Sequence, residues 1–128
     1  METKSNIVGW FEIPVIDMDR AVKFYEAVFD IKLARHKLGT LEMAWFPWTD
    51  KSYGAGGSLV LEKNHYKPST DGVLIYLSSA SGDLGTELAK VEKAGGRILQ
   101  QKKQIGEHGF MALFTDTEGN RIAMHSMN

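Results

Sequence analysis

Glu12 and His125 are the two residues of this 128-residue chain whose types and placement fit acid–base chemistry. A carboxylate and an imidazole can take up and release protons near neutral pH. Each residue lies in a predicted strand, where alternation puts Glu12 with Trp10, and His125 with Ala123, on the face away from the apolar side chains. We therefore expect both to face one inner surface, either as a proton-transfer pair or as a hydrogen-bonded pair that satisfies two buried polar groups.

Aromatic side chains gather on or beside the same predicted inner strands. Flat rings in a pocket can sandwich an apolar or planar ligand. The residues expected to contact a ligand are Trp10, Trp45, Trp48, Tyr53 and Tyr76, with His108 at the mouth of the pocket. Ordinary core packing is the alternative for Trp45, whereas Trp48 follows a proline and is expected in a loop.

The other histidines and the Gly-rich segment give weaker signals. His36 and His65 fall near predicted loops or strand ends, and neither pairs with another histidine at a metal-binding spacing, so both are expected at the surface. Residues 53–57 are rich in glycine but lack the Gly-Lys-Ser/Thr ending of a phosphate-binding loop. We expect this segment to be a flexible loop over the pocket or a plain turn.

Two similar units must position these residues. In the first, a strand over residues 8–16 precedes a helix with apolar residues at spacings of three and four, and Asp17 can cap that helix. In the second, a strand over residues 73–79 precedes a helix that Asp83 can cap and that a Gly-Gly pair ends. Three further strands follow each helix, and these are predicted over residues 31–37, 41–46 and 58–62 in the first unit and 97–101, 110–115 and 121–126 in the second.

This order predicts an α+β fold of paired βαβββ modules, at about residues 7–63 and 72–127, within one domain over residues 1–128. The capping aspartates, Asp17 and Asp83, are 83 − 17 = 66 residues apart, which suggests a duplication. We expect each module to curl a sheet around a pocket while its helix covers the outer, apolar face.

Composition excludes several classes of protein. The 15 basic and 16 acidic side chains give a net charge of −1, without the cationic excess that binding to nucleic acid requires. The chain has no cysteine, which excludes a disulfide, a thiolate zinc site and a cysteine nucleophile. It also lacks an apolar stretch of signal-peptide or membrane-spanning length, so we expect a soluble, cytoplasmic protein with no membrane partner.

Three segments of the chain resemble the vicinal-oxygen-chelate superfamily, which includes glyoxalase I, bleomycin-resistance proteins and extradiol dioxygenases. They are IPVIDMDRAVKFYEAVF at residues 13–29, VEKAGGRIL at residues 91–99 and GFMALFTDTEGNRIAMH at residues 109–125. The resemblance covers nearly the whole chain and implies the paired βαβββ fold with a pocket inside the curved sheet. Members that do chemistry usually hold one divalent metal with side chains of the inner strands, so the resemblance also implies ligand positions.

Three of the four implied ligand positions carry side chains that cannot bind a metal, and these are Trp10, Leu74 and Ala123. The fourth falls near Glu62, the one acidic candidate on its strand. We therefore expect no metal site and no cofactor. A divalent metal held by Glu12, Glu62 or His125 is the less favoured alternative.

The resemblance leaves three functions open for a protein that binds a small organic molecule. The first is a lyase or isomerase without the usual metal site, in which Glu12 acts as the base and His125 as its partner or acid. The second is a non-catalytic protein of bleomycin-resistance type that binds or sequesters its ligand. The third and least favoured is a metal-dependent lactoylglutathione lyase, because that isomerisation relies on a metal to stabilise an enediolate. The resemblance also implies a homodimer whose partner loops close each pocket.

Overall fold

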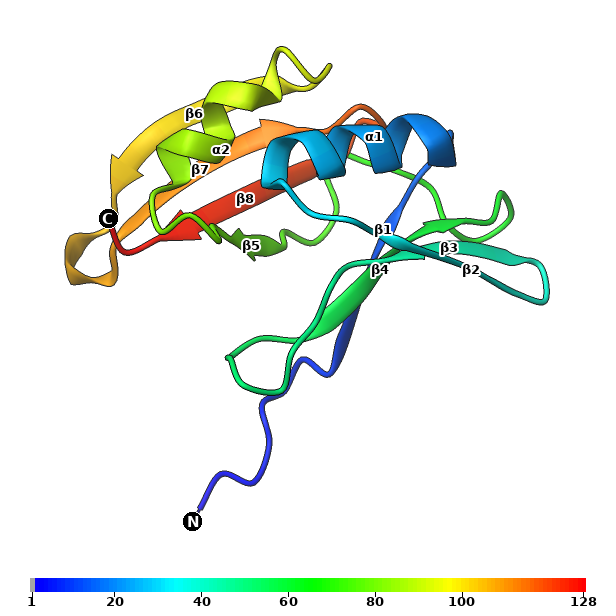
Figure 1. Ribbon diagram of the computed structural model, residues 1–128, viewed down its shortest axis with the longest axis horizontal. Coiled ribbons are helices and arrows are strands. Elements are labelled where there is room, and N and C mark those ends of the chain that lie inside the picture. Colours follow the sequence, from blue (N-terminus) through cyan, green and yellow to red (C-terminus); the bar gives the residue numbers. More distant parts are fainter. Residues whose placement is uncertain (1) are drawn as a thin grey trace.

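The computed structural model describes residues 2–128, which form two four-stranded sheets, each with one helix (Figure 1). The first module contains β1 (Trp10–Pro14), α1 (Met18–Phe29), β2 (Ala34–Leu38), β3 (Leu41–Trp45) and β4 (Gly56–Leu61). The second contains β5 (Tyr76–Ser78), α2 (Leu84–Val91), β6 (Arg97–Gln104), the short 3-10 helix η1 (Gly106–His108), β7 (Phe110–Thr115) and β8 (Arg121–Ser126). This element order confirms the predicted α+β fold of paired βαβββ modules.

The two sheets have equivalent strand orders. The first runs β1-β4-β3-β2 and the second runs β5-β8-β7-β6. In each, the first strand pairs in parallel with the last strand of its module, and the other neighbours are antiparallel. The parallel pair is possible because the helix crosses over between them.

Both helices begin after the aspartates that the sequence indicates. The Asp17 carboxylate accepts a hydrogen bond from the backbone N–H of Arg20 at 3.1 Å, and Asp83 accepts one from Gly85 at 2.9 Å. Each short side chain thus satisfies a first-turn amide that has no partner within its helix. With 12 residues in α1 and 8 in α2, residues 2–128 contain no helix long and apolar enough to cross a membrane.

The hydrophobic core lies between the helices and one face of each sheet. Figure 1 shows α1 and α2 on the same side of the two sheets. Ile13 of β1 and Ile122 and Met124 of β8 belong to this core and are at most 3% exposed. The predicted alternation is therefore confirmed, and Glu12 and His125 lie on the opposite face of their sheets, which we call the open face.

Gly56 and Gly57 belong to β4, so the loop or turn expected over residues 53–57 is wrong for its last two positions. A Cβ atom on Gly57 would lie 2.3 Å from ring carbons of Phe11. Only glycine allows the Phe11 ring to cross this strand, because any side chain would occupy the same space. A glycine required for a close approach and a glycine required for a turn look alike in the sequence.

In the second module, β7 and β8 have the predicted bounds, whereas β5 and β6 differ in length from the prediction. β5 has three residues where the sequence predicts a strand over residues 73–79, and Val73 is 93% exposed. β6 continues to Gln104, past the predicted end at residue 101. Its pairing with β7 shifts register twice, which interrupts the alternation that the prediction relies on.

The turn between β7 and β8 ties the second module to α1. Glu118 Oε1 accepts hydrogen bonds from the backbone N–H groups of residues 16 and 17, each at 2.8 Å. The same carboxylate binds the Arg20 guanidinium at 2.8 and 3.0 Å. Asp116 accepts a hydrogen bond of 2.6 Å from the buried hydroxyl of Tyr25. These contacts fix the start of α1 against the second module.

Candidate functional site

The Glu12 carboxylate lies on the open face of β1 between two donors. Trp10 Nε1 donates a hydrogen bond of 3.2 Å to Oε2, and the Tyr66 hydroxyl donates one of 2.8 Å to Oε1. The hydrogen bond to Glu12 raises the pKa of Tyr66, because the tyrosinate would face the carboxylate. Glu12 is therefore held as an oriented acceptor by two aromatic side chains.

Sequence reasoning did not find Tyr66. It lies in the connection between the modules, 54 positions from Glu12 along the chain. The backbone N–H of Tyr66 bonds to the carbonyl of Glu62 at 3.1 Å, which turns the chain back toward β1. No local pattern in the sequence marks such a long-range contact.

His125 is held by the segment that precedes β7. Its Nε2 lies 2.6 Å from the backbone carbonyl of His108, and because a carbonyl can only accept, Nε2 is the donor. A Cβ atom on Gly109 would lie 2.3 Å from the carbonyl oxygen of Ser126 and 3.2 Å from His125 Nε2. Glycine is thus required for this approach, and the hydrogen bond leaves His125 Nδ1 available to other partners.

Glu12 and His125 have separate hydrogen-bond partners. Within residues 2–128, Glu12 bonds to Trp10 and Tyr66, His125 bonds to His108, and no hydrogen bond or ion pair joins Glu12 to His125. Both lie on the open face of their sheets, as the alternation predicts. Their role as a proton-transfer pair stays a prediction.

Four rings lie together on the open face of the first sheet. The Trp10 and Trp45 ring centroids are 5.6 Å apart in an edge-to-face arrangement, and His36 lies 3.9 Å from Trp45. A Cβ atom on Gly56 would lie 3.3 Å from Trp48 and 3.4 Å from Trp10, so both indoles border this glycine. We call Trp10, Trp45, Trp48 and His36 the aromatic cluster.

The cluster adjoins Glu12 and contains an unpaired donor. Register places Glu12 opposite Ser58, and Ser58 opposite Trp45, so the three form one row across the sheet. The indole Nε1 of Trp45 is buried and has no hydrogen-bond partner among residues 2–128. An unpaired buried N–H costs about 1 to 3 kcal/mol, so an acceptor that reached it would be favoured.

The remaining sequence-predicted ligand residues lie outside this cluster. Tyr76 is 51% exposed on β5 opposite Ala123, on the open face of the second sheet. Tyr53 is 99% exposed in the loop before β4. His108 is exposed in η1, and its backbone carbonyl makes the contact described above. His36 is exposed, as expected, but its stacking on Trp45 was not predicted.

The donor set does not fit the divalent metal that the resemblance implies. Residues 2–128 contain no group of three or more His, Asp or Glu side chains that could hold a metal ion. The candidate Glu62 instead bonds to the His65 ring at 2.8 Å, and this hydrogen bond, with that from Asn64, lowers the pKa of Glu62. Ala123, at another implied ligand position, is fully buried.

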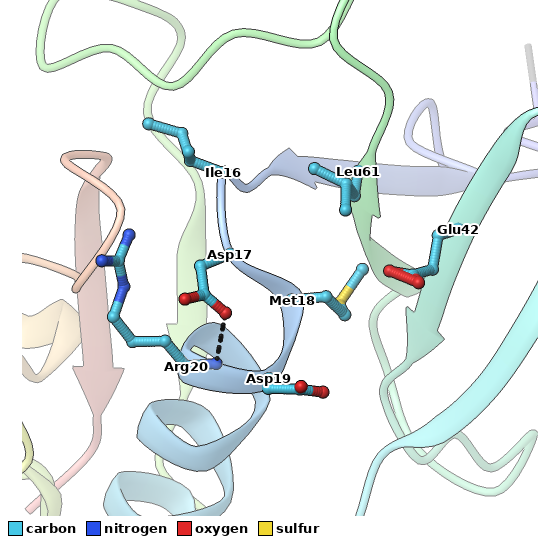
Figure 2. A pocket seen from close by; sticks show the side chains of 7 residues that line it. All are labelled: Ile16, Asp17, Met18, Asp19, Arg20, Glu42 and Leu61. Carbon is cyan, nitrogen blue, oxygen red and sulfur yellow. Dashed lines mark hydrogen bonds between the residues drawn. The ribbon is translucent and has the colours of Figure 1, made fainter.

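Two cavities lie away from the open face. One, of about 470 Å³, is at the N-terminal end of α1 and is lined by Ile16, Asp17, Met18, Asp19, Arg20, Glu42 and Leu61. Figure 2 shows the Met18 side chain pointing toward Glu42, while Asp17 bonds to the backbone of α1. The other, of about 580 Å³, lies between α1 and α2. Neither is lined by Glu12, His125 or the aromatic cluster.

Comparison with known proteins gives one family. A model described as the Glyoxalase/Bleomycin resistance protein/Dioxygenase superfamily matches residues 7–124. A "Glyoxylase-like domain-containing protein" from Didymella fabae is 29% identical over 123 residues, which cover 91% of each chain.

Solved structures share the fold at low sequence identity. A glyoxylase/bleomycin resistance protein/dioxygenase domain from Frankia sp. EAN1pec has a TM-score of 0.73 at 17% identity, over 98% of this chain and all of that one. TnmS3, an antibiotic binding protein from Streptomyces sp. CB03234, has a TM-score of 0.65 at 22% identity, over 99% and 100% of the two chains. Glyoxalase I from Zea mays has a TM-score of 0.66 at 19% identity over 91% of this chain, which spans 44% of the maize chain.

Proposed function

The chain belongs to the glyoxalase/bleomycin resistance protein/dioxygenase superfamily, and from this premise we propose that it binds a small planar organic molecule against its aromatic cluster. The observation that carries the proposal is the group of rings on the open face, where Trp10 is 44% and Trp48 63% exposed. Exposed indoles are costly in water and offer flat surfaces on which a planar ligand can stack.

Polar groups beside the rings support a ligand with a hydrogen-bonding edge. Glu12 can accept from a ligand donor, and its two aromatic donors keep it oriented. Trp45 Nε1 is a donor without a partner. A few fixed polar groups among apolar rings are typical of small-molecule sites. The same fold in an antibiotic binding protein is compatible with this function.

Ligand binding at the cluster can be tested by NMR. All three tryptophans of the chain belong to the cluster, so their signals are specific for this surface. In a ¹H–¹⁵N spectrum, the three indole N–H signals therefore report on this surface. We expect 2-naphthol to shift them and its saturated analogue, decahydro-2-naphthol, to have little effect. Trp48→Ala should weaken binding about tenfold through the lost stacking and contact area. Tyr53→Ala is the matched control, because Tyr53 is fully exposed outside the cluster. Equal shifts with the saturated compound would contradict the proposal.

A lyase or isomerase activity is the second candidate, and the geometry of His125 favours it. The hydrogen bond to the His108 carbonyl holds the ring with Nε2 as donor, which leaves Nδ1 to accept a proton. Glu12 would be the base and His125 its partner, or an acid once Nδ1 has taken up a proton. A double-mutant cycle with Glu12→Gln and His125→Asn tests the pair, and a coupling free energy of zero would remove it.

We also propose that the protein acts without a metal and as a homodimer. The lack of a group of three or more His, Asp or Glu side chains among residues 2–128 supports function without a metal. For the same reason, a metal-dependent lactoylglutathione lyase is the least favoured function. Exposed apolar residues support the homodimer: Trp10, Trp48 and Tyr76 on or beside the open faces would be covered by a partner or a ligand.

A further inference from the structure

The cavity between α1 and α2 is a second candidate site, and we call it the interhelical groove. It has a volume of about 580 Å³, within the range of small-molecule pockets. The two helices contact each other and lie on the same side of the two sheets (Figure 1). By strand alternation, the aromatic cluster is on the other face of the first sheet. Its lining divides into cations and apolar residues.

Four cations surround the groove: Arg20 and Lys23 from α1, Lys90 from the last turn of α2, and Lys93 from the turn after it. Arg20 is neutralised by Glu118 at 2.8 Å. None of the three lysines has an ion-pair partner among residues 2–128. In a chain whose net charge is −1, this is a local excess of positive charge around a concave surface, which attracts anions.

The floor of the groove is apolar. It is formed by Ala27 and Ala94 together with Phe24, which is itself only 1% exposed. Phe24 is fixed, because Gly96 lies so close that a Cβ atom there would be 2.7 Å from the ring. The two alanine side chains are small, and Ala27 is exposed. The body of a ligand in this groove would therefore contact an apolar surface. One end of the ligand would contact the ammonium groups of the lysines.

We propose that the interhelical groove binds a small amphiphilic organic anion, such as a carboxylate or sulfate on an aliphatic chain. The chain would lie on Ala27 and Ala94, beside the nearly buried Phe24, and the anionic head would lie among Lys23, Lys90 and Lys93. An inorganic anion would leave the apolar floor exposed, and an uncharged ligand would leave the lysines unpaired. This site is independent of the aromatic cluster and of the function proposed for it.

Calorimetric titration with decanoate, below its micelle concentration, tests the proposal. We expect decanoate to bind the wild-type protein, and decyltrimethylammonium and inorganic sulfate to bind at least tenfold more weakly. Lys90→Gln combined with Lys93→Gln should reduce decanoate affinity about tenfold, because two charge contacts are lost. Lys63→Gln combined with Lys67→Gln is the matched control, since both lysines are exposed in the connection after β4. Thermal melting of each variant confirms that it is folded.

Several outcomes would overturn the proposal. Equal affinity for decyltrimethylammonium would mean that the charge is not recognised, and equal affinity for sulfate or an acidic peptide would mean that the floor is not used. Unchanged affinity in the groove variant would place the ligand elsewhere. Shifts of the tryptophan indole N–H signals on adding decanoate, unaffected by the lysine substitutions, would assign it to the aromatic cluster. A further outcome is that the protein binds phosphatidylserine vesicles in a lysine-dependent way and does not bind decanoate. That result would show that the groove binds an anionic membrane surface rather than a small molecule.

Discussion

Replacing Glu118 by glutamine should destabilise the protein in a pH-dependent way. The Glu118 side chain is completely inaccessible to solvent, and its two oxygens accept five hydrogen bonds. The donors are the backbone N–H groups of Ile16 and Asp17, two nitrogens of Arg20, and the Thr117 hydroxyl. All five donors favour the ionised carboxylate.

The magnitude follows from the pKa of Glu118. Burial raises this pKa, but the hydrogen bonds from Arg20 and from the backbone of residues 16 and 17 outweigh it and lower the pKa from 4.5 to about 2. At about 1.36 kcal/mol per pKa unit, this corresponds to roughly 3 kcal/mol. Arg20 is 48% exposed, so solvent screening reduces the figure to about 2 to 3 kcal/mol. Glu118→Gln should cost a similar amount at pH 7, because its amide also turns one acceptor into a donor.

The sign of the pH dependence is set by the lowered pKa. A carboxyl whose pKa is lower in the folded state stabilises the protein above its unfolded pKa of about 4.5. That stabilisation is lost as the pH falls from 4.5 toward 2. The glutamine variant has no such group, so its free energy of unfolding should fall less steeply over this interval.

Urea unfolding at pH 7 and at pH 3 measures both effects. Glu107→Gln is the control, because Glu107 is an exposed carboxylate in η1. Its unfolding free energy should match that of the wild type within about 0.5 kcal/mol. A Glu118→Gln variant as stable as the control at pH 7, with the same acid sensitivity as the wild type, would refute the role given to the β7–β8 turn.

Three further predictions follow from other contacts. Gly57→Ala should destabilise the protein by about 2 kcal/mol or more in thermal unfolding, since its Cβ would lie 2.3 Å from the Phe11 ring, whereas Gly72→Ala, with no atom within 4 Å, should not. Glu12→Gln should lower the pKa of Tyr66, measured by NMR titration of the ring, because the carboxylate that raises it is gone; an unchanged pKa would contradict the Glu12–Tyr66 contact. Elemental analysis of untagged protein purified without added metal should find well under one equivalent of zinc, nickel, manganese or iron, and stoichiometric metal lost in Glu12→Gln would overturn our assignment.

Local features of the fold could be predicted from the sequence, because their causes are local. Asp17 and Asp83 cap their helices through contacts within three residues, and the alternation of Ile13 or Ile122 with polar neighbours assigns faces within one strand. Gly57 could not be assigned to β4, since the reason for a glycine there is the Phe11 ring from another strand.

The sequence predicts on which face of the sheets the site residues lie, but it does not predict their hydrogen-bond partners. Alternation correctly puts Glu12 and His125 on the open face, yet their partners come from elsewhere in the chain. Tyr66 reaches Glu12 across 54 positions, and the His108 carbonyl reaches His125 across 17. Such contacts depend on how the connections close over the sheets, for which the residue pattern carries no signal.

Trp10 lies at a position where the resemblance implies a metal ligand, and it also belongs to the aromatic cluster proposed to bind a small molecule. By resemblance, this position on β1 would carry a metal ligand, and here it carries an indole that packs edge-to-face against Trp45 and donates a hydrogen bond to Glu12. A side chain of that size cannot share the position with a metal ion and its ligands. Trp10 therefore presents a flat apolar surface at the position where the resemblance implies a metal ligand, and its Nε1 orients the neighbouring Glu12 carboxylate. For this reason we propose ligand binding, rather than metal-assisted chemistry, as the function of the open face.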